Sequence, residues 1–481
     1  MLFDALTVSF ALHLLLCADV ALASPTLRRS ESPSSRGLHI PLTRRAAPER
    51  NDAELGLWAK QQKELLEGKY GRPTNTNTKR SSGYNLLVDQ KLDSDYYGSI
   101  AVGTPPVAFD VILDTGSADL WLVDAQCTEG CDGLQAFSPS SSSTFTNDTK
   151  PFSVTYGSGQ AAGYLATDVV QMAGFSVQNQ VFGVCDQVSD GLLIAPVSGL
   201  MGLGWQSLSS SGAKPLWQAL YDDNVLDEPV MAFYLTRFQN ASRPQDLEPG
   251  GVFTLGSTNT SLYTGQIEYL DIPSGAVSYW TLPLTNLTVN SNSVSLPSGS
   301  SSYVAIDTGT TLIGGPASQV ASLYASIPNS AAGTGNYEGY YTYPCSTTVN
   351  VAMSFGGQSW AISSDDFKLA QISNGECLGA IFVYSTGSGG SNSGSPAWIV
   401  GDTFLKNVYS VFRANPASVG FAAIAPDAQS SVTRNGVPTA TIGSASVSVT
   451  GNHSGSAALP SALPHLVTLL FVMTTSLFYF L

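Results

Sequence analysis

Short apolar runs separated by small polar residues dominate the chain between residues 81 and 427. Val111-Ile112-Leu113 and Val304-Ala305-Ile306 are typical, and each gives way to a turn-forming segment rich in Gly, Ser or Thr. Apolar runs of about four to eight residues that end in turn formers are typical of β-strands. Long amphipathic helical patterns are scarce, so the pattern predicts an all-β body.

The same short motif follows both of these runs. Asp114-Thr115-Gly116-Ser117 follows the first and Asp307-Thr308-Gly309-Thr310 the second. A single Asp-Thr-Gly also suits an ordinary turn. A second mark, two bulky apolar residues and a Gly, comes 88 residues after the first Asp, at Gly202, and 94 residues after the second, at Gly401. The repeated order of marks predicts an internal duplication and two similar lobes.

A duplicated fold can bring together one carboxyl from each half. Two carboxyls about 3 Å apart do not both ionise, so one keeps a proton and the other stays charged. Such a pair supplies a general base for a water and a general acid for a carbonyl, without a metal or cofactor. We therefore predict Asp114 and Asp307 as catalytic residues. Small and hydroxyl residues beside them are expected to hold the carboxyls in place: Thr115, Gly116, Ser117, Thr308, Gly309 and Thr310.

With Trp121 and the segment Tyr156-Gly157-Ser158-Gly159, these motifs resemble the pepsin-like aspartic peptidases over roughly residues 83–426. The resemblance implies a bilobal β fold with a pseudo-twofold axis and a cleft between an N-terminal lobe (81–261) and a C-terminal lobe (262–426). It also implies that Tyr156 stands at the tip of a flap, with Gly157 and Ser158, and bonds the Trp121 indole. Taken singly, Trp121 is better interpreted as an ordinary core aromatic and Tyr156 as a turn residue.

In the dyad, the resemblance implies that Ser117 and Thr310 hydrogen-bond the carboxyls from outside. Thr115 and Thr308 would brace the two loops against each other. The glycines of both motifs would contribute backbone N–H groups.

Histidine placement argues against rival hydrolytic chemistries. The four histidines are His13, His39, His453 and His465, so none lies between Ser81 and Asp427. Serine and cysteine hydrolases of the usual kind, and zinc peptidases, need imidazole in the catalytic core. The body of this chain has none.

Charge divides the chain into a basic leader and an acidic body. Residues 1–23, with an apolar run and Ala21-Leu22-Ala23, predict a secretory signal peptide, the alternative being a buried N-terminal helix. Residues 24–80 hold 12 Lys+Arg against 6 Asp+Glu, whereas the chain from Ser81 onward holds 9 against 28. This asymmetry predicts an inhibitory pro-segment that the body binds electrostatically and releases in acid. A solvated helix without inhibitory role is the alternative.

Two sites in the leader carry specific expectations. The dibasic pair Lys79-Arg80 predicts processing that leaves Ser81 as the mature N-terminus. The resemblance adds that Lys69-Tyr70 would cover the catalytic carboxyls in the zymogen.

Cysteine spacing predicts disulfides. Cys127 and Cys131 lie four residues apart with no histidine nearby, which in a secreted chain favours a disulfide over a metal site. The resemblance implies a second disulfide between Cys345 and Cys377. Cys185 is then left as a buried free thiol.

The C-terminal region predicts surface attachment. Residues 427–455 are rich in Ser, Thr and Gly and predict a flexible stalk, and residues 456–481 predict a GPI-anchor signal, as in fungal GPI-anchored (yapsin-like) members of the family. A tail-anchored membrane span is the alternative. Asn-x-Ser/Thr sequons mark candidate N-glycosylation sites at Asn147, Asn240, Asn259, Asn286 and Asn452.

Together these features predict a secreted, monomeric aspartic endopeptidase that is made as a zymogen, acts on extended peptides in acid and is anchored at the cell surface. Its partners would be peptide substrates and its own pro-segment, with no nucleic acid. Two other classes stay open: a catalytically inactive binding protein on the same fold and a structural wall protein. Hydrolysis of a denatured protein near pH 4 would separate the enzyme from both.

Overall fold

The computed structural model describes residues 80–451, except 240, 242, 244, 276, 374, 385–394, 435 and 441–444. All described residues belong to one compact unit. The signal peptide, the pro-segment with Lys69, Tyr70 and Lys79, the sequons at Asn240 and Asn452, and the anchor signal lie outside the described residues.

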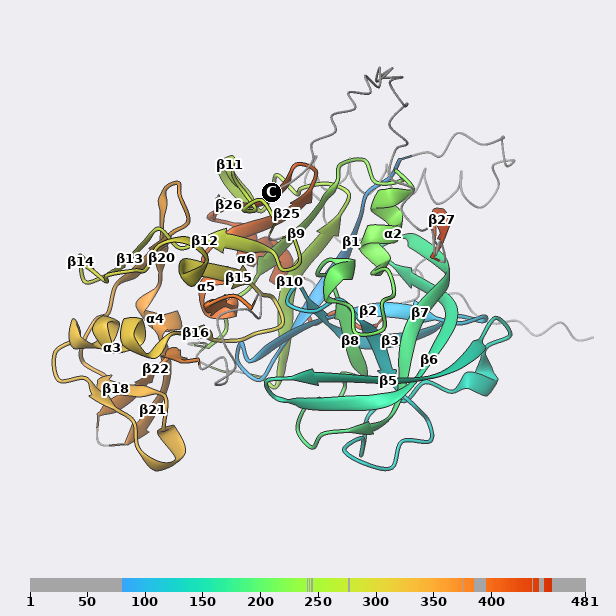
Figure 1. Cartoon of the computed structure of the whole chain (residues 1–481), viewed down its shortest axis with the longest axis horizontal. Helices are drawn as coiled ribbons and strands as arrows, with labels where there is room; N and C mark the ends of the chain where they lie inside the picture. The colour runs from blue at the N-terminus through green and yellow to red at the C-terminus, as the bar shows by residue number, and fades with distance from the viewer. Residues whose placement is uncertain are drawn as a thin grey trace, which may run out of the picture. The chain divides into compact units, whose positions relative to one another are not determined.

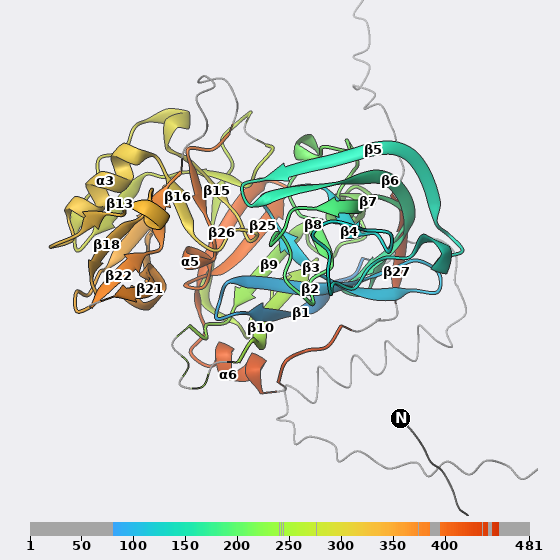
Figure 2. The same ribbon diagram turned by 90° about the horizontal axis from the view of Figure 1, so that it is seen from below.

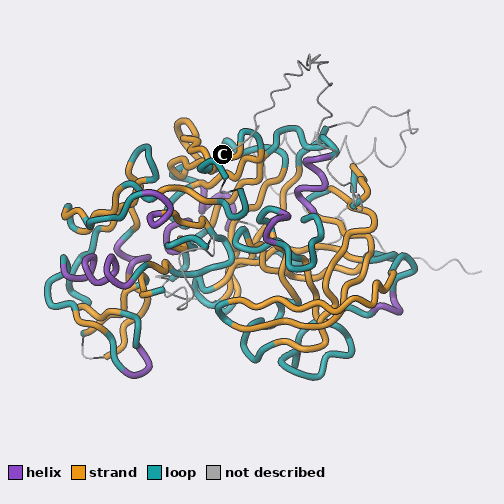
Figure 3. Tube along the Cα trace, in the orientation of Figure 1, coloured by secondary structure: helices purple, strands orange, loops and turns teal. Residues whose placement is uncertain are grey.

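Strands dominate the described part of the chain, and the helices are short (Figures 1 and 3). This confirms the all-β prediction. The five helices among the described residues are α2 (Leu216–Asp222), α3 (Ala317–Ala325), α4 (Ser364–Phe367), α5 (Asp402–Leu405) and α6 (Ala428–Thr433). Single 3₁₀ turns are η1 (Pro139–Ser141), η2 (Gln206–Leu208), η3 (Gly299–Ser302) and η4 (Gly335–Tyr337). In the described ranges no helix is both long enough and apolar enough to span a membrane.

The largest sheet has 14 strands. They are β1 (Gly83–Gln90), β2 (Asp95–Val102), β3 (Val107–Asp114), β4 (Leu120–Val123), β5 (Thr146–Tyr156), β6 (Gly159–Met172), β7 (Phe175–Val188), β8 (Gly199–Gly202), β9 (Val230–Leu235), β10 (Leu247–Leu255), β11 (Tyr263–Asp271), β25 (Tyr409–Ala414), β26 (Ala417–Ile424) and β27 (Val447–Thr450). β9 pairs with both β10 and β25, so this sheet runs continuously across the lobe boundary predicted at 261/262.

Three smaller sheets complete the C-terminal half. The five-stranded sheet holds β12 (Thr281–Pro283), β15 (Tyr303–Ile306), β16 (Ile313–Gly315), β23 (Ile381–Val383) and β24 (Trp398–Val400). One four-stranded sheet holds β13 (Asn286–Val289), β14 (Asn292–Ser293), β19 (Val351–Ser354) and β20 (Ser359–Ile362). The other holds β17 (Ala331–Ala332), β18 (Tyr341–Pro344), β21 (Lys368–Ser373) and β22 (Glu376–Gly379).

Strand pairing repeats the duplication that the sequence predicted. In the N-terminal half β3 runs parallel to β8, β8 antiparallel to β4, and β4 parallel to β7. In the C-terminal half β15 runs parallel to β24, β24 antiparallel to β16, and β16 parallel to β23. In each half the Asp motif lies between the first and third members of this set, so the two motifs have equivalent positions. The result is the predicted two-lobed fold.

Aromatic packing joins the two halves beneath the motifs. The rings of Trp205, Trp217 and Trp280 lie with centroids 5.0–5.6 Å apart. The Trp280 indole N–H donates to the carbonyl of Leu203, which lies in the other half, at 2.9 Å. Because Trp217 and Trp280 are also fully buried, this cluster anchors one half firmly on the other.

The segment predicted as a flexible stalk from residue 427 is different in the structure. α6 packs against the body, with Ala428 fully buried and the Gln429 amide donating to the Arg237 carbonyl at 2.8 Å. Farther on, β27 pairs with β7. A Ser/Thr/Gly-rich composition indicates low burial on average, but the few apolar residues in this segment pack against the body.

Candidate active site

Each motif Asp stands at the end of a buried strand. Asp114 is the last residue of β3 and lies in parallel register with Gly202 of β8. Asp307 directly follows β15, and its N–H donates to the Val400 carbonyl at 3.0 Å. The inward-facing apolar residues of both strands are buried in the hydrophobic core. Packing as well as hydrogen bonding therefore fixes the two turns.

The second mark of each half packs directly against the motif loop. A Cβ placed on Gly202 would overlap the backbone of Ala118, and a Cβ on Gly401 would overlap the carbonyl of Thr310. Only glycine allows this close approach of backbones. The spacing that marked the duplication therefore reflects a packing requirement of the loops.

The Asp114 carboxylate is held from within its own motif. The N–H of Gly116 donates to Oδ1 at 2.7 Å, and the hydroxyl of Ser117 donates to Oδ2 at 2.5 Å. Both donors lie within three residues of the Asp, so the turn itself orients the carboxyl.

The second motif repeats this arrangement. The N–H of Gly309 donates to Oδ1 of Asp307 at 2.9 Å, and the hydroxyl of Thr310 donates to Oδ2 at 2.7 Å. The two carboxyls therefore have equivalent partners at equivalent oxygens, as a twofold arrangement requires.

The two motif loops are also bonded to each other. The N–H of Thr115 donates to the Thr308 hydroxyl at 3.1 Å, and the N–H of Thr308 donates to the Thr115 hydroxyl at 3.0 Å. These hydroxyls donate in turn to the carbonyls of Ile306 and Leu113, at 2.9 and 2.6 Å. Both threonines are buried, so the reciprocal bonds lock the loops in one relative position.

This lock brings the two carboxyls close together, each against the glycine of the other motif loop. A Cβ on Gly309 would overlap the carboxyl of Asp114, and a Cβ on Gly116 that of Asp307. The Asp side chains are only 5% and 8% exposed. Burial, followed by the neighbouring charge of Asp307, raises the pKa of Asp114 well above its usual range. This environment therefore favours the protonated form of Asp114.

A hairpin reaches over this pair. β5 and β6 are antiparallel, with Tyr156 paired to Gly159, so Gly157 and Ser158 form the exposed two-residue turn. The Trp121 indole N–H donates to the Tyr156 hydroxyl at 2.8 Å. Burial, with a smaller contribution from the charge of Asp114, raises the pKa of Tyr156, so its phenol stays neutral beside the carboxyls.

Comparison with known proteins agrees with the arrangement of the two Asp motifs and the hairpin. A family model described as eukaryotic aspartyl protease matches residues 95–424, which include both motifs and the hairpin. The chain belongs to the pepsin-like aspartic peptidases. Major aspartyl peptidase 1 of Cryptococcus neoformans var. grubii is 43% identical over 75% of this chain and 75% of its own length. The aspartic protease of Phaffia rhodozyma is 34% identical over 86% and 98%, and pig pepsin A 31% identical over 70% and 83%.

Membership of this family confirms the resemblance and the enzyme class predicted from the two motifs. The protein is an aspartic endopeptidase, and its substrates are peptides.

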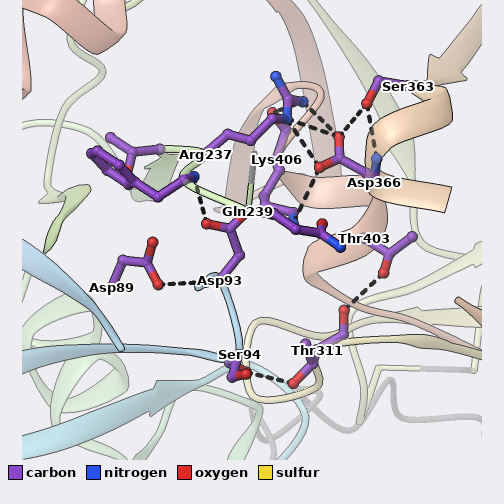
Figure 4. A network of polar contacts seen from close by, with 12 residues as sticks. Asp89, Asp93, Ser94, Arg237, Gln239, Thr311, Ser363, Asp366, Thr403 and Lys406 are labelled. Carbon is purple, nitrogen blue, oxygen red and sulfur yellow. Dashed lines mark hydrogen bonds and ion pairs between the residues drawn. The ribbon is translucent and has the colours of Figure 1, made fainter. Parts of the chain in front are cut away.

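This aspartic peptidase also contains a buried ionic network that the sequence did not predict (Figure 4). The Lys406 ammonium lies 2.8 Å from the Asp93 carboxylate and 3.1 Å from that of Asp366. Arg237 makes a bidentate contact with Asp366, the closest approach being 2.7 Å. Lys406, Asp93 and Asp366 are all at most 4% exposed. Burial alone would raise the pKa of Asp366. Hydrogen bonding from Arg237 and the charge of Lys406 outweigh this effect and lower the pKa.

The network extends to the edge of the active site (Figure 4). Thr311 follows the second motif directly, and its hydroxyl donates to the Ser94 carbonyl at 2.5 Å. The Thr403 hydroxyl donates to the Thr311 carbonyl at 3.1 Å. The turn between β1 and β2 is therefore tied to the C-terminal motif both by charge and by hydroxyl bonds. One sequence signal indicates such a network. Basic residues are rare in the body, and a Lys within an apolar segment therefore indicates a buried acidic partner.

Both predicted disulfides are present. Cys127 and Cys131 are bonded with an S–S length of 2.09 Å, and Cys345 and Cys377 with one of 2.01 Å. Cys185 is buried and unbonded, and burial raises the pKa of its thiol. It therefore lacks the thiolate character that reactive cysteines need.

The surface residues singled out in the sequence lie as follows. Arg80 is exposed, and the next residue, Ser81, is bonded to the body through its N–H, which donates to the Val225 carbonyl at 2.7 Å. Asn147 and Asn286 are exposed, and Asn259 is half-buried.

Proposed function

We propose that Asp114 and Asp307 share one proton and activate a water between them for attack on a peptide carbonyl. The close approach of the two carboxyls across the paired loops carries this proposal. The charged member accepts a proton from the water, and the protonated member donates to the carbonyl oxygen. The proton then reaches the leaving amine from the same pair. The symmetric N–H and hydroxyl donors fix both carboxyls before substrate binds.

Substitution of either carboxyl tests this mechanism. Asp114→Asn and Asp307→Asn are each expected to lower kcat for peptide hydrolysis by at least about 10³-fold, because an amide neither accepts nor carries the shared proton. Unfolding midpoints of both variants should stay close to that of the parent. The exposed Asp271→Asn is the matched control and should retain full activity. Substantial turnover in both dyad variants, free of contaminating peptidase, is incompatible with the proposal.

We infer that Tyr156 closes over bound substrate with the turn Gly157-Ser158. Its bond to Trp121 supports this role, because it holds the hairpin tip above the dyad from a fully buried indole. A closed hairpin would exclude water and strengthen the field at the carboxyls. Extended peptides fit such a site, since the hairpin offers backbone groups along its length.

We propose that the enzyme is secreted as a zymogen and processed after Lys79-Arg80. The basic leader and acidic body support electrostatic inhibition, with Lys69-Tyr70 over the dyad. Exposure of Arg80 beside the bonded Ser81 gives a processing peptidase access to the junction without disturbing the body. Replacing Lys79 and Arg80 by Ala should leave a longer chain that is inactive near neutral pH. Full activity of the unprocessed chain at that pH would overturn the zymogen proposal.

We propose further that a GPI anchor holds the mature enzyme at the cell surface. The support is in the sequence: small residues at Ser454-Gly455-Ser456, a spacer, and the apolar run Leu466 to Leu481. Phosphatidylinositol-specific phospholipase C should release the active enzyme from a membrane fraction. Retention after this treatment, with extraction only by detergent, would favour a membrane-spanning tail instead.

A further inference from the structure

A third buried carboxyl, that of Asp119, has a set of hydrogen-bond donors that the mechanism does not use. Asp119 directly precedes β4 and is 3% exposed. Its Oδ1 accepts the hydroxyls of Ser209 at 2.7 Å and Ser211 at 2.5 Å, and the Ser211 N–H at 3.1 Å. Its Oδ2 accepts the Ser210 N–H at 2.7 Å. All four donors belong to one segment, residues 205–211, which we call the serine loop.

This set of donors matches a carboxylate. Both oxygens of a carboxylate accept hydrogen bonds, whereas the amide of Asn would turn an NH₂ group toward one part of an all-donor set. A carboxylate that is taken out of water needs a cation or several hydrogen bonds in compensation. The four donors of the serine loop supply this compensation, so the loop and Asp119 hold each other in place.

The serine loop begins beside the first catalytic motif. The Gly204 N–H donates to the Ser117 carbonyl at 2.6 Å, and the Ser117 hydroxyl in turn donates to Asp114. A Cβ placed on Gly204 would lie 2.8 Å from the Ser117 carbonyl oxygen and 3.0 Å from the Leu208 side chain. The half-buried Leu208 therefore gives the loop an apolar side chain close to the motif that carries Asp114.

The serine loop is also bonded to the other half of the molecule. The Trp205 N–H donates to the Ser278 carbonyl, and the Ser207 hydroxyl donates to the Val277 carbonyl, each at 3.3 Å. The next residue, Tyr279, lies near the dyad. Burial is the main cause of its raised pKa, and the charges of both dyad carboxyls contribute. The loop thus joins the first motif to a residue of the C-terminal half that lies near the same carboxyls.

On its other side Asp119 lies close to the flap. β4 carries Trp121, whose indole N–H donates to the hydroxyl of Tyr156. Burial and the charge of Asp114 raise the pKa of Tyr156, and the charge of Asp119 adds to them. Figure 2 shows β4 between β8 and β7, with the flap strands β6 and β5 beyond. One carboxyl is therefore placed between the serine loop and the flap.

We propose that Asp119 is a positioning residue, which holds the serine loop in the form that receives one apolar side chain of a bound peptide. Asp119 acts through the loop and takes no part in the chemistry. A loop that is already ordered loses little conformational freedom when a peptide binds, and this raises the affinity for the side chain that meets it. Leu208 makes that side chain an apolar one. The proposal rests on the hydrolysis proposed above.

A series of peptides tests this role on the active enzyme. Leu and Ala are compared at each of the four positions on either side of the scissile bond, and mass spectrometry confirms the cleavage site. At the position that meets the serine loop, the parent should prefer Leu by at least about tenfold in kcat/KM. Asp119→Ala should reduce this preference to within about threefold through a higher KM for the Leu peptide, and leave the other preferences unchanged. A purely structural contribution would lower all rates in parallel.

Matched variants assign the effect to the contact with the loop. Ser209→Ala combined with Ser211→Ala removes both hydroxyl donors, and it should weaken the preference at the same position. Asp168→Asn is the control. This carboxyl is 1% exposed and accepts a hydroxyl from Thr144 and a backbone N–H, but it lies nine residues along β6 from Gly159 at the flap turn. Whatever its effect on stability, Asp168→Asn should leave every preference unchanged.

The outcomes separate this role from the proposed hydrolysis. A parallel loss at all positions, unchanged preferences, or changes at different positions in the two loop variants would overturn the positioning role and leave the dyad mechanism intact. If Asp119→Ala fails to fold, the double serine variant decides, since both of its substitutions lie in the half-buried loop. If the parent cuts none of the peptides, the proposed hydrolysis fails and the positioning role with it.

Discussion

The carboxyl of Asp89 should make this protein less stable as the pH rises from 4 to 8. Asp89 lies in β1, is 1% exposed and accepts the Asp93 N–H at Oδ1, 2.8 Å away. Its other oxygen is buried and has no hydrogen-bond partner among the described residues. Burial, together with the neighbouring Asp93 carboxyl, raises the pKa of Asp89 from 3.8 to about 8. A protonated carboxyl is therefore the form that the fold accommodates.

The magnitude follows from proton linkage. A raised acid pKa means that the folded protein keeps a proton which the unfolded chain loses above pH 3.8. The contribution of this carboxyl to the free energy of unfolding is therefore fully present below pH 3.8. It declines as the pH rises towards the pKa of the folded state. Each unit costs about 1.4 kcal/mol, which amounts to about 4 kcal/mol between pH 4 and pH 7. Asp89→Asn abolishes this titration and keeps an acceptor for the Asp93 N–H.

Urea unfolding at pH 4, 5, 6 and 7 measures the effect, in an Asp307→Asn background that prevents self-digestion. The free energy of unfolding of Asp89→Asn, relative to the parent, should rise by about 4 kcal/mol from pH 4 to pH 7. Buried carboxyls that do not contact Asp89 titrate equally in both proteins, so their contributions cancel. The exposed Asp271→Asn should give a flat difference. An equally flat difference for Asp89→Asn would refute the reasoning.

Three further outcomes follow from other contacts. Tyr156→Phe removes the hydroxyl that accepts the Trp121 indole N–H and should lower kcat/KM about five- to tenfold, with an unchanged unfolding midpoint; a loss confined to stability would contradict its role in the flap. Lys406→Met leaves the buried carboxylates of Asp93 and Asp366 without their shared cation and should cost about 3–5 kcal/mol at pH 7 in urea unfolding; an unchanged free energy of unfolding would contradict this. Cys345→Ser opens a 32-residue loop and should cost about 4 kcal/mol, against about 2 kcal/mol for Cys127→Ser and its four-residue loop; equal losses by calorimetry would argue against a loop-entropy origin.

The active-site motifs could be read from the sequence because their interactions are local. Asp114 takes its hydrogen bonds from Gly116 and Ser117, within three residues, so the motif contains its own supporting groups. The duplication then predicted that a second, equivalent set would face it. Contacts across the pair, such as those of Thr115 with the other loop, came only from the family resemblance, since they join residues 193 apart.

The ionic network and the strand β27 were not predictable in the same way. Lys406 and Asp93 are 313 residues apart, and neither lies in a recognisable motif. In β27 the alternation of Val447 and Val449 occupies only four residues inside a Ser/Thr-rich segment, which is too short to outweigh the composition. Both features depend on where the fold places a distant partner, and for that reason composition indicated a stalk where the structure has a strand.

The duplicated loops are equivalent in their nearest contacts, but their surroundings are not. The residue after the packed glycine is Leu203 in the first half and Asp402 in the second. Asp402 is buried, and burial raises its pKa well above the usual range, with the Asp307 charge acting in the same direction and Lys406 opposing both. A carboxyl that stays neutral in acid thus lies beneath only one member of the dyad. The two otherwise matched carboxyls therefore have different surroundings, because an apolar residue follows the packed glycine in the first half and a buried carboxyl follows it in the second.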